Sequence, residues 1–256
     1  MNRASALFVS LTLAFLAGSA QADLGHSVTD FSNGTNGWDG IQPSEPIEGW
    51  GTWVDPTSGN GGAGLHTRVP DSWFATWHNN TNAAVLGDYT KSGGFSIGLD
   101  VRAESIIYLD MMVEVQRNLI VELRDYDNTS GGLPYTSVWY NLGSIGAGID
   151  WQHLSVTVSN PLSTTLPTGW GGYGGEDAVG NPILPAGTTF TDVLKGVDEV
   201  VFTTAEPGWF YGFTYFDVTL DNIAITAVPE PATLLMQGLG LATLAGFLRR
   251  RAKRAA

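Results

Sequence analysis

Hydrophobic and polar side chains alternate along several short stretches of this 256-residue chain. Residues 95–102, 119–124 and 154–159 place an apolar side chain at every second position. Successive side chains of a β-strand point to opposite faces of its sheet, so this pattern predicts strands with one buried face. Residues 106–115 and 200–204 are more continuously apolar, as expected for strands at the centre of a sheet.

Glycine-rich segments separate these predicted strands. The densest are residues 59–64 and 169–175, and clusters of this kind punctuate short strands. One helical pattern occurs, at residues 190–197, where apolar side chains recur at i, i+3, i+4 and i+7. Together these features predict an all-β fold, an antiparallel β-sandwich of the jelly-roll kind with one short helix.

The first 22 residues have the three parts of a secretory signal peptide. Arg3 supplies a positive charge, residues 6–18 form an apolar segment, and residues 20–22 offer a small-x-small cleavage site. We therefore expect an N-terminal signal helix at residues 1–22, read by the export machinery and removed by signal peptidase. The mature domain is predicted at residues 23–227.

An apolar stretch of 17 residues, 232–248, lies near the C-terminus, and five cations follow it within residues 249–254. Its length is at the short end of what spans a bilayer as one helix. The cations would keep the C-terminus on the cytoplasmic side, so we predict a C-terminal transmembrane helix in the inner membrane. Pro229 and Pro231, on either side of Glu230, mark its boundary because proline lacks an amide donor.

The order of these parts resembles the PEP-CTERM sorting signal of exported bacterial proteins. The residues that carry the resemblance are Pro229, Glu230, Pro231, Arg249, Arg250 and Arg251. It implies that an exosortase, a membrane transpeptidase, cuts near the Pro-Glu-Pro and passes the protein to the cell surface or extracellular space of a Gram-negative bacterium. Residues 228–256 are thus a predicted sorting signal, and the alternative is a plain anchor that is never cleaved.

The mature domain is strongly acidic and has no cysteine. It holds 6 of the 12 cations and 24 of the 25 acidic residues, so its formal charge is −18, against −13 for the whole chain. An acidic domain repels nucleic acid and anionic lipid, which argues against both as partners. Without disulfides, a core built by about 200 residues must supply the stability.

A second resemblance covers most of the mature domain. The segments that carry it are residues 30–34 with Trp38, 85–89, 93–101, 188–194, 197–202 and 220–223. They are similar to laminin-type B modules and to related carbohydrate-binding jelly rolls. These positions are mostly structural, so the resemblance implies a fold more than a ligand.

Tryptophan and tyrosine are the first candidates for binding a ligand. Sugar rings stack on exposed aromatic faces, while Asp, Asn and Gln orient the hydroxyl groups. The predicted sugar-binding residues are Trp170, Tyr173, Trp73 and Trp77. Further aromatic pairs are Trp50 with Trp53 and Trp139 with Tyr140. The alternative for each is packing in the core or at a strand edge, because strands favour aromatic residues.

Calcium is the second candidate ligand, because it takes several oxygen ligands from carboxylates, amides and carbonyls. Asp30 lies near the first predicted strand, and Asp221 and Asn222 lie on the last, where the ends of a jelly roll pair. The resemblance to carbohydrate-binding modules implies a structural Ca²⁺ in this area. Residues 125–128 form a second oxygen-rich turn. For both, the alternative is a solvated turn or an Asx cap.

Signals for catalysis are sparse. Glu114 and Glu122, on neighbouring predicted strands, would be a carboxylate pair for glycoside hydrolysis. The histidines lack metal-ligand spacing, and the sequence has no thiol, nucleophile elbow or phosphate-binding loop. We therefore predict a non-catalytic component of the cell envelope or extracellular matrix that binds polysaccharide or another surface protein. The alternatives are a glycan-active hydrolase and a structural matrix protein without a specific ligand.

Overall fold

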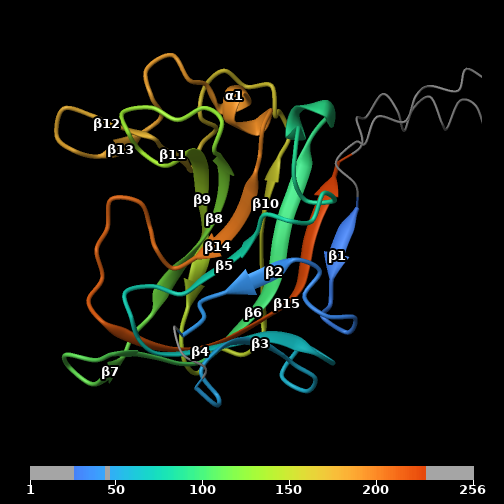
Figure 1. The fold of residues 1–256 in the computed structure, drawn as a ribbon, viewed down its shortest axis with the longest axis vertical. Helices are drawn as coiled ribbons and strands as arrows, with labels where there is room; N and C mark the ends of the chain where they lie inside the picture. Colours follow the sequence, from blue (N-terminus) through green and yellow to red (C-terminus); the bar gives the residue numbers. More distant parts are fainter. Residues whose placement is uncertain (1–25, 44–46, 229–256) are drawn as a thin grey trace, which may run out of the picture.

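Two antiparallel sheets pack face to face in this computed structural model, which describes residues 26–43 and 47–228 (Figure 1). Sheet A consists of β1 (Ser27–Thr29), β3 (Gly51–Asp55), β4 (Gly64–Ser72), β6 (Phe95–Tyr108), β7 (Val113–Glu114), β10 (Gln152–Val158) and β15 (Thr214–Ala227). Its order is β10-β6-β15-β4-β3, with β1 beside β15 and β7 beside β6. The long strands β6 and β15 therefore form its centre.

Sheet B is the second layer and has the order β11-β9-β8-β14-β5-β2. Its strands are β2 (Trp38–Gly40), β5 (Thr76–Asn79), β8 (Arg117–Asp125), β9 (Thr136–Ile145), β11 (Trp170–Tyr173) and β14 (Glu199–Thr203). A small ribbon of β12 (Gly175–Glu176) and β13 (Pro182–Ile183) follows β11. The turn η1 (Tyr89–Lys91) is a single 3-10 segment.

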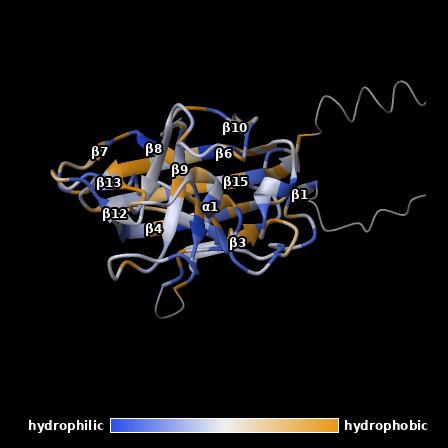
Figure 2. Cartoon of the chain, turned by 90° about the horizontal axis from the view of Figure 1, so that it is seen from above, coloured by the Kyte–Doolittle hydropathy of each residue, from blue (hydrophilic) through white to orange (hydrophobic). Residues whose placement is uncertain are grey.

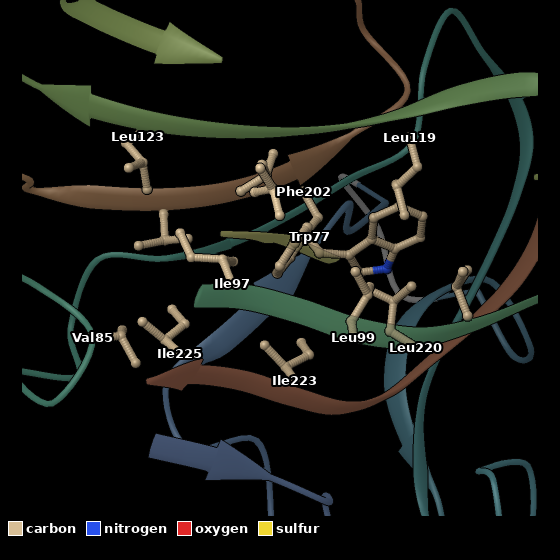
Figure 3. Close-up of a cluster of buried hydrophobic side chains, with 14 of the residues drawn as sticks. Trp77, Val85, Ile97, Leu99, Leu119, Leu123, Phe202, Leu220, Ile223 and Ile225 are labelled. Carbon is tan, nitrogen blue, oxygen red and sulfur yellow. The ribbon is translucent and has the colours of Figure 1, made fainter. Parts of the chain in front are cut away.

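The core lies between the two sheets and joins side chains far apart in the sequence (Figure 3). Its members include Trp77, Val85, Ile97, Leu99, Leu119, Leu123, Phe202, Leu220, Ile223 and Ile225, each at most 2% exposed. Figure 2, seen from above, shows hydrophobic stretches along the strands. Fully burying one such side chain is worth about 1.5–3 kcal/mol. This core is what stabilises a domain that has no disulfide.

The α-helix predicted from the apolar repeat is present but short. It is α1 (Phe190–Leu194), and it begins at a capping box. The Thr189 hydroxyl accepts the Asp192 N–H at 3.2 Å, and the Asp192 carboxylate accepts the Thr189 N–H at 3.1 Å. These bonds satisfy free N–H groups of the first turn. Val197, the last position of the repeat, lies beyond the helix and bonds with Gly87 instead.

The apolar run at residues 106–115 is not one central strand, so that prediction is wrong. The chain leaves β6 after Tyr108, turns, and returns as β7. Met112 has a left-handed φ of 51°, and its N–H donates to the Leu109 carbonyl at 3.3 Å, which closes the turn. Met111 and Met112 are both exposed. The apolar run therefore includes the tip of an exposed hairpin.

The predicted all-β, antiparallel β-sandwich with one short helix is confirmed. Within residues 26–43 and 47–228, we find no helix with the length and apolar character needed to cross a membrane. The predicted signal helix and the predicted transmembrane helix at residues 232–248 lie outside the described residues.

Candidate functional site

Sheet B has one face on the core and an outer face directed away from it. Leu119, Val121 and Leu123 of β8 belong to the core, so Glu122 and Arg124 alternate onto the outer face. Cross-strand pairing continues from Glu122 in both directions. It places Trp139, Glu122, Val201, His78 and Asp39 in one row across β9, β8, β14, β5 and β2.

A buried ion network lies in and beside this row. Arg124 donates from Nε and Nη2 to Glu122 Oε2, at 2.8 and 2.6 Å, and from Nη1 to Glu199 Oε2, at 3.0 Å. The Ser137 hydroxyl donates to Glu122 Oε1 at 2.6 Å. Glu122 and Glu199 are only 3% and 4% exposed. Two buried carboxylates are tolerated here because one guanidinium pairs with both of them and hydrogen bonds occupy their oxygen atoms.

Glu199 has two further partners at the edge of the network. The Tyr126 hydroxyl donates to Oε2 at 2.7 Å, and His78 Nδ1 lies 2.9 Å from Oε1. Burial alone would raise the pKa of Glu199, but the contact with His78, the Tyr126 hydrogen bond and the charge of Arg124 lower it to about 2. The same carboxylate raises the pKa of His78. Glu199 is therefore ionised at neutral pH and does not suit the role of the protonated acid in glycoside hydrolysis.

Tyrosine rings cover this network. The ring of Tyr135 lies over Arg124, with 4.3 Å between Cζ and the ring centroid. Tyr126 and Tyr173 both pack against Tyr135, at centroid distances of 5.7 and 5.1 Å. Tyr126 is exposed, and Tyr135 and Tyr173 are half-buried. The network thus holds a group of partly exposed rings in a defined arrangement.

Trp139, at one end of the row, lies against Gly171 of the neighbouring strand β11. A Cβ atom on Gly171 would collide with the indole ring. The indole N–H points to the Gly172 carbonyl at 3.4 Å. The glycines of residues 170–173 therefore make room for a half-buried ring in a strand. This differs from the loop that the glycine content predicted.

Two of the four predicted sugar-binding residues belong to the core. Trp77 is fully buried, and its indole N–H donates to Thr67 Oγ1 at 2.7 Å. Trp170 is 8% exposed and packs against Phe190 and Tyr140, at centroid distances of 5.2 and 5.5 Å. Both side chains point inward from their strands. Neither presents the open ring face that was predicted.

The other two predicted residues keep exposed surface but belong to different clusters. Tyr173 lies with Tyr135 on the outer face of sheet B. Trp73 is 46% exposed, follows β4, and packs against Phe210 and Phe213 of the loop before β15. The structure therefore brings Tyr173 to the ion network and leaves Trp73 in a separate aromatic cluster.

The predicted calcium ligands lie where the first and last strands pair. β1 pairs with β15 up to Thr29, so Asp30 follows at the level of Asn222. Asn222 has a left-handed φ of 47°, at a bulge in β15, and its side-chain amide donates to Asp100 at 2.9 Å. Burial raises the pKa of Asp221, and the charges of Asp100 and Asp30 raise it further.

Hydrogen bonds already occupy some of the oxygen atoms of the predicted calcium ligands. The backbone N–H of Asn60 donates to Asp221 Oδ2 at 2.7 Å. Among the residues that the structure describes, no group of three or more His, Cys, Asp or Glu side chains is arranged to hold a metal ion. In the second oxygen-rich turn, Asp125 Oδ1 accepts the N–H groups of Asp127 and Asn128, which is the Asx turn given as the alternative. Calcium at Asp30, Asp221 and Asn222 stays a prediction.

The placement of Glu114 and Glu122 on neighbouring strands, considered for the hydrolase alternative, is wrong. Glu114 lies in β7 of sheet A and Glu122 in β8 of sheet B, so the two do not share a sheet. The partner of Glu122 is Arg124, and Glu199 completes the group. Sequence reasoning missed this cluster, although Glu122 and Arg124 gave a signal: opposite charges two residues apart on a strand share one face and can pair.

The fold is similar to several solved structures of low sequence identity. One is the C-terminal family 22 carbohydrate-binding module of Clostridium thermocellum Xyn10B, at 11% identity and a TM-score of 0.41, covering 81% of this chain and 96% of that chain. Another is a family 11 carbohydrate-binding module from Clostridium thermocellum in complex with a β-1,3-1,4-mixed-linked tetrasaccharide, at 14% identity and a TM-score of 0.43, covering 80% of this chain and 98% of that chain. At these values the likeness says nothing about which residues of this chain bind a ligand.

Sequence comparison identifies the C-terminal segment. No curated protein sequence matches the chain. Residues 227–252, however, match the PEP-CTERM protein-sorting motif. They contain the Pro229, Glu230 and Pro231 that carried the resemblance, so that prediction is confirmed. The chain therefore carries a PEP-CTERM protein-sorting motif, which indicates export, processing by an exosortase and sorting to the cell surface.

Proposed function

We propose that the mature domain is a non-catalytic glycan-binding module of the cell surface or extracellular matrix, and that the outer face of sheet B is its binding face. One observation carries this proposal: a buried ion network holds partly exposed aromatic rings and polar side chains on one face of a rigid sheet. Preorganised groups bind well because little freedom is lost on binding. The ligand we propose is a polysaccharide.

The side chains of this face have the chemistry that a sugar chain needs. Tyr173, Tyr135 and Trp139 offer apolar ring surface, on which the apolar side of a pyranose can stack. His78 and Asp39 offer polar groups further along the row, where sugar hydroxyls need donors and acceptors. A non-catalytic role agrees with the lowered pKa of Glu199, because hydrolysis needs one protonated carboxyl.

The test is affinity electrophoresis and calorimetry of the full chain, in a detergent without a sugar head group, with mixed-linked β-glucan, xylan, agarose and the host's own extracellular polysaccharide. We expect saturable binding to at least one polymer. Replacing Tyr173 or Trp139 by alanine should weaken binding by about 1–2 kcal/mol, a factor of roughly 5–30. The matched control is Trp73→Ala, which removes an exposed ring from the other aromatic cluster and should leave the affinity unchanged.

Two results would contradict this assignment. Absence of binding to all four polymers would favour a structural matrix protein without a specific ligand. If Trp73→Ala abolishes binding and Tyr173→Ala does not, the binding site lies at the cluster of Trp73, Phe210 and Phe213. A reducing-end assay on the same polymers tests the hydrolase alternative, and release of new ends would contradict the non-catalytic role.

We also propose the finer steps of delivery. Residues 232–248 hold the precursor in the inner membrane of a Gram-negative host until the exosortase cuts near the Pro-Glu-Pro. Replacing Glu230 by alanine should cause the full-length precursor to accumulate in the inner-membrane fraction. Equal processing of the variant and the natural chain would show that Glu230 is not read.

Asp30, Asp221 and Asn222 remain our proposed calcium ligands. Support comes from Asp221, whose raised pKa reflects burial and the repulsion of Asp100 and Asp30 that a bound cation would relieve. Thermal unfolding with CaCl₂ and with a chelator tests this, because a ligand at 100 times its Kd stabilises the folded state by about 2.7 kcal/mol. We expect Asp221→Asn to remove the difference. Equal melting temperatures in calcium and in chelator would exclude a structural site.

A further inference from the structure

The edges of the two sheets meet at a small pocket, separate from the outer face of sheet B. β10 is an edge strand of sheet A and β11 an edge strand of sheet B, and the loop of residues 159–169 connects them. The pocket between them has a volume of about 220 Å³. Pockets for drug-sized ligands measure about 300–1,000 Å³, so this one suits a single small ring.

The lining of this pocket combines aromatic rings with uncharged polar groups. Trp170 and Tyr140 form an aromatic wall, and Ser159, Asn160, Ser163 and Thr168 supply hydroxyl and amide groups around it. None of the described residues that line the pocket is acidic or basic. This is notable in a domain with 24 acidic residues and 6 cations. A ligand that matches the pocket is therefore neutral and carries many hydrogen-bonding groups.

Three of the residues that line the pocket, Asn160, Ser163 and Trp170, are held in place by contacts with α1 or within the loop. The Thr191 hydroxyl donates to the Ser163 carbonyl at 2.7 Å, and the Thr191 N–H donates to the same carbonyl at 3.2 Å, which ties the loop to α1. Trp170 packs edge-on against Phe190, also of α1, at an interplanar angle of 71°. Asn160 Oδ1 accepts the Leu162 N–H at 3.2 Å, which orients its amide and leaves the NH₂ as a donor.

We infer that this pocket binds one neutral pyranose ring. The ring lies against the edge of Trp170 and the ring of Tyr140, and its hydroxyls bond with Asn160, Ser159 and Thr168. The aromatic pair faces the core side of β11 and β9, whereas Trp139 and Tyr173 face the outer side. The pocket is therefore independent of the polysaccharide face, and the inference does not depend on that proposal.

The experiment is ¹⁹F NMR of the full chain labelled with 5-fluorotryptophan, in a detergent without a sugar head group. The probes are the neutral methyl pyranosides of glucose, galactose, mannose and xylose. The variant Trp170→Phe identifies the Trp170 resonance among those of the nine tryptophans. We expect at least one pyranoside to shift this resonance saturably, with a Kd on the order of 1 mM.

Two variants connect the shift to the pocket. Thr168→Phe places a ring in the pocket from an exposed position and should abolish the shift. Asn160→Asp keeps the acceptor for Leu162 but loses the NH₂ donor, so it should weaken binding about tenfold, the typical loss for one neutral hydrogen bond. The matched control is Asn33→Asp, which adds the same charge at an exposed site and should change nothing.

The outcomes separate clearly. A saturable Trp170 shift that Thr168→Phe abolishes and Asn160→Asp weakens supports the inference. No shift of Trp170 with any pyranoside overturns it, and so does a shift that persists in Thr168→Phe. The other tryptophan resonances report whether each variant is folded. If Thr168→Phe does not fold, Asn160→Asp alone tests the inference, and an unchanged Trp170 shift in that variant overturns it. Loss of polysaccharide binding in Tyr173→Ala without loss of the Trp170 shift would show that the two sites are separate.

Discussion

Arg124 is the residue whose replacement tests the ion network most directly. Methionine at position 124 keeps an unbranched side chain but removes all three hydrogen bonds to Glu122 and Glu199. The two glutamate side chains are 4% and 6% exposed, so water does not replace the lost guanidinium. Removing one partner from a buried ion pair typically costs 3–5 kcal/mol, and we expect Arg124→Met to lower the free energy of unfolding by about this amount.

The matched control is Arg102→Met. Arg102 pairs with Glu104, and these side chains are 31% and 49% exposed. Exposed ion pairs contribute about 0–1 kcal/mol because water and salt screen them. Arg102→Met should therefore cost less than about 1 kcal/mol. The two variants remove the same charge. They differ in how far the partner carboxylates are buried and in their number, two for Arg124 and one for Arg102.

Urea unfolding at pH 7, followed by tryptophan fluorescence, measures both free energies. The midpoint should fall while the slope m stays constant, because the surface exposed on unfolding is unchanged. In a domain of this size 1 kcal/mol corresponds to about 2–4 °C, so the melting temperature of Arg124→Met should fall by roughly 6–20 °C. Adding Glu122→Gln and Glu199→Gln to Arg124→Met should recover most of the loss. A cost no larger than that of Arg102→Met would refute the network as a source of stability.

Three further predictions concern the network and the core. The pKa of Glu199 is lowered to about 2, so its contribution to the free energy of unfolding is present above the unfolded pKa of about 4.3 and is lost as the pH falls toward 2. Unfolding free energies measured across this acid range should show the loss in the natural chain and not in Glu199→Gln. The pKa of His78 is raised in the folded state, so its contribution to the free energy of unfolding is present below about pH 6.5 and is lost as the pH rises through the folded-state pKa. In His78→Gln the free energy of unfolding should not change with pH in this range for that reason. Trp77→Ala should cost about 3–5 kcal/mol in urea unfolding and leave the polysaccharide affinity of the folded fraction unchanged, whereas a loss of affinity would contradict its assignment to the core.

Local patterns in the sequence were enough to predict the strands β6, β8, β10 and β14 and the start of α1. The alternating residues of β6, β8 and β10 were found because a strand repeats every two residues and one of its faces is buried. The same reasoning failed at Met111 and Met112, where apolar side chains lie in an exposed turn. Apolar content alone does not distinguish a buried strand from a hairpin tip whose conformation depends on one left-handed residue.

The sequence by itself determined the class of the protein and its destination. Periodicity and the terminal PEP-CTERM motif are properties of short segments, and the absence of cysteine is a property of the composition, so each can be read without knowing the fold. Only the tertiary structure decided which side chains act together. Arg124 meets Glu199 across 75 residues of sequence because β8 and β14 are neighbours in sheet B. Tyr173 faces outward and Trp170 inward because side chains alternate between the two faces of a strand, and these two residues are three positions apart. Which face is the outer one depends on strand order and register, and these come from long-range packing that no local pattern encodes.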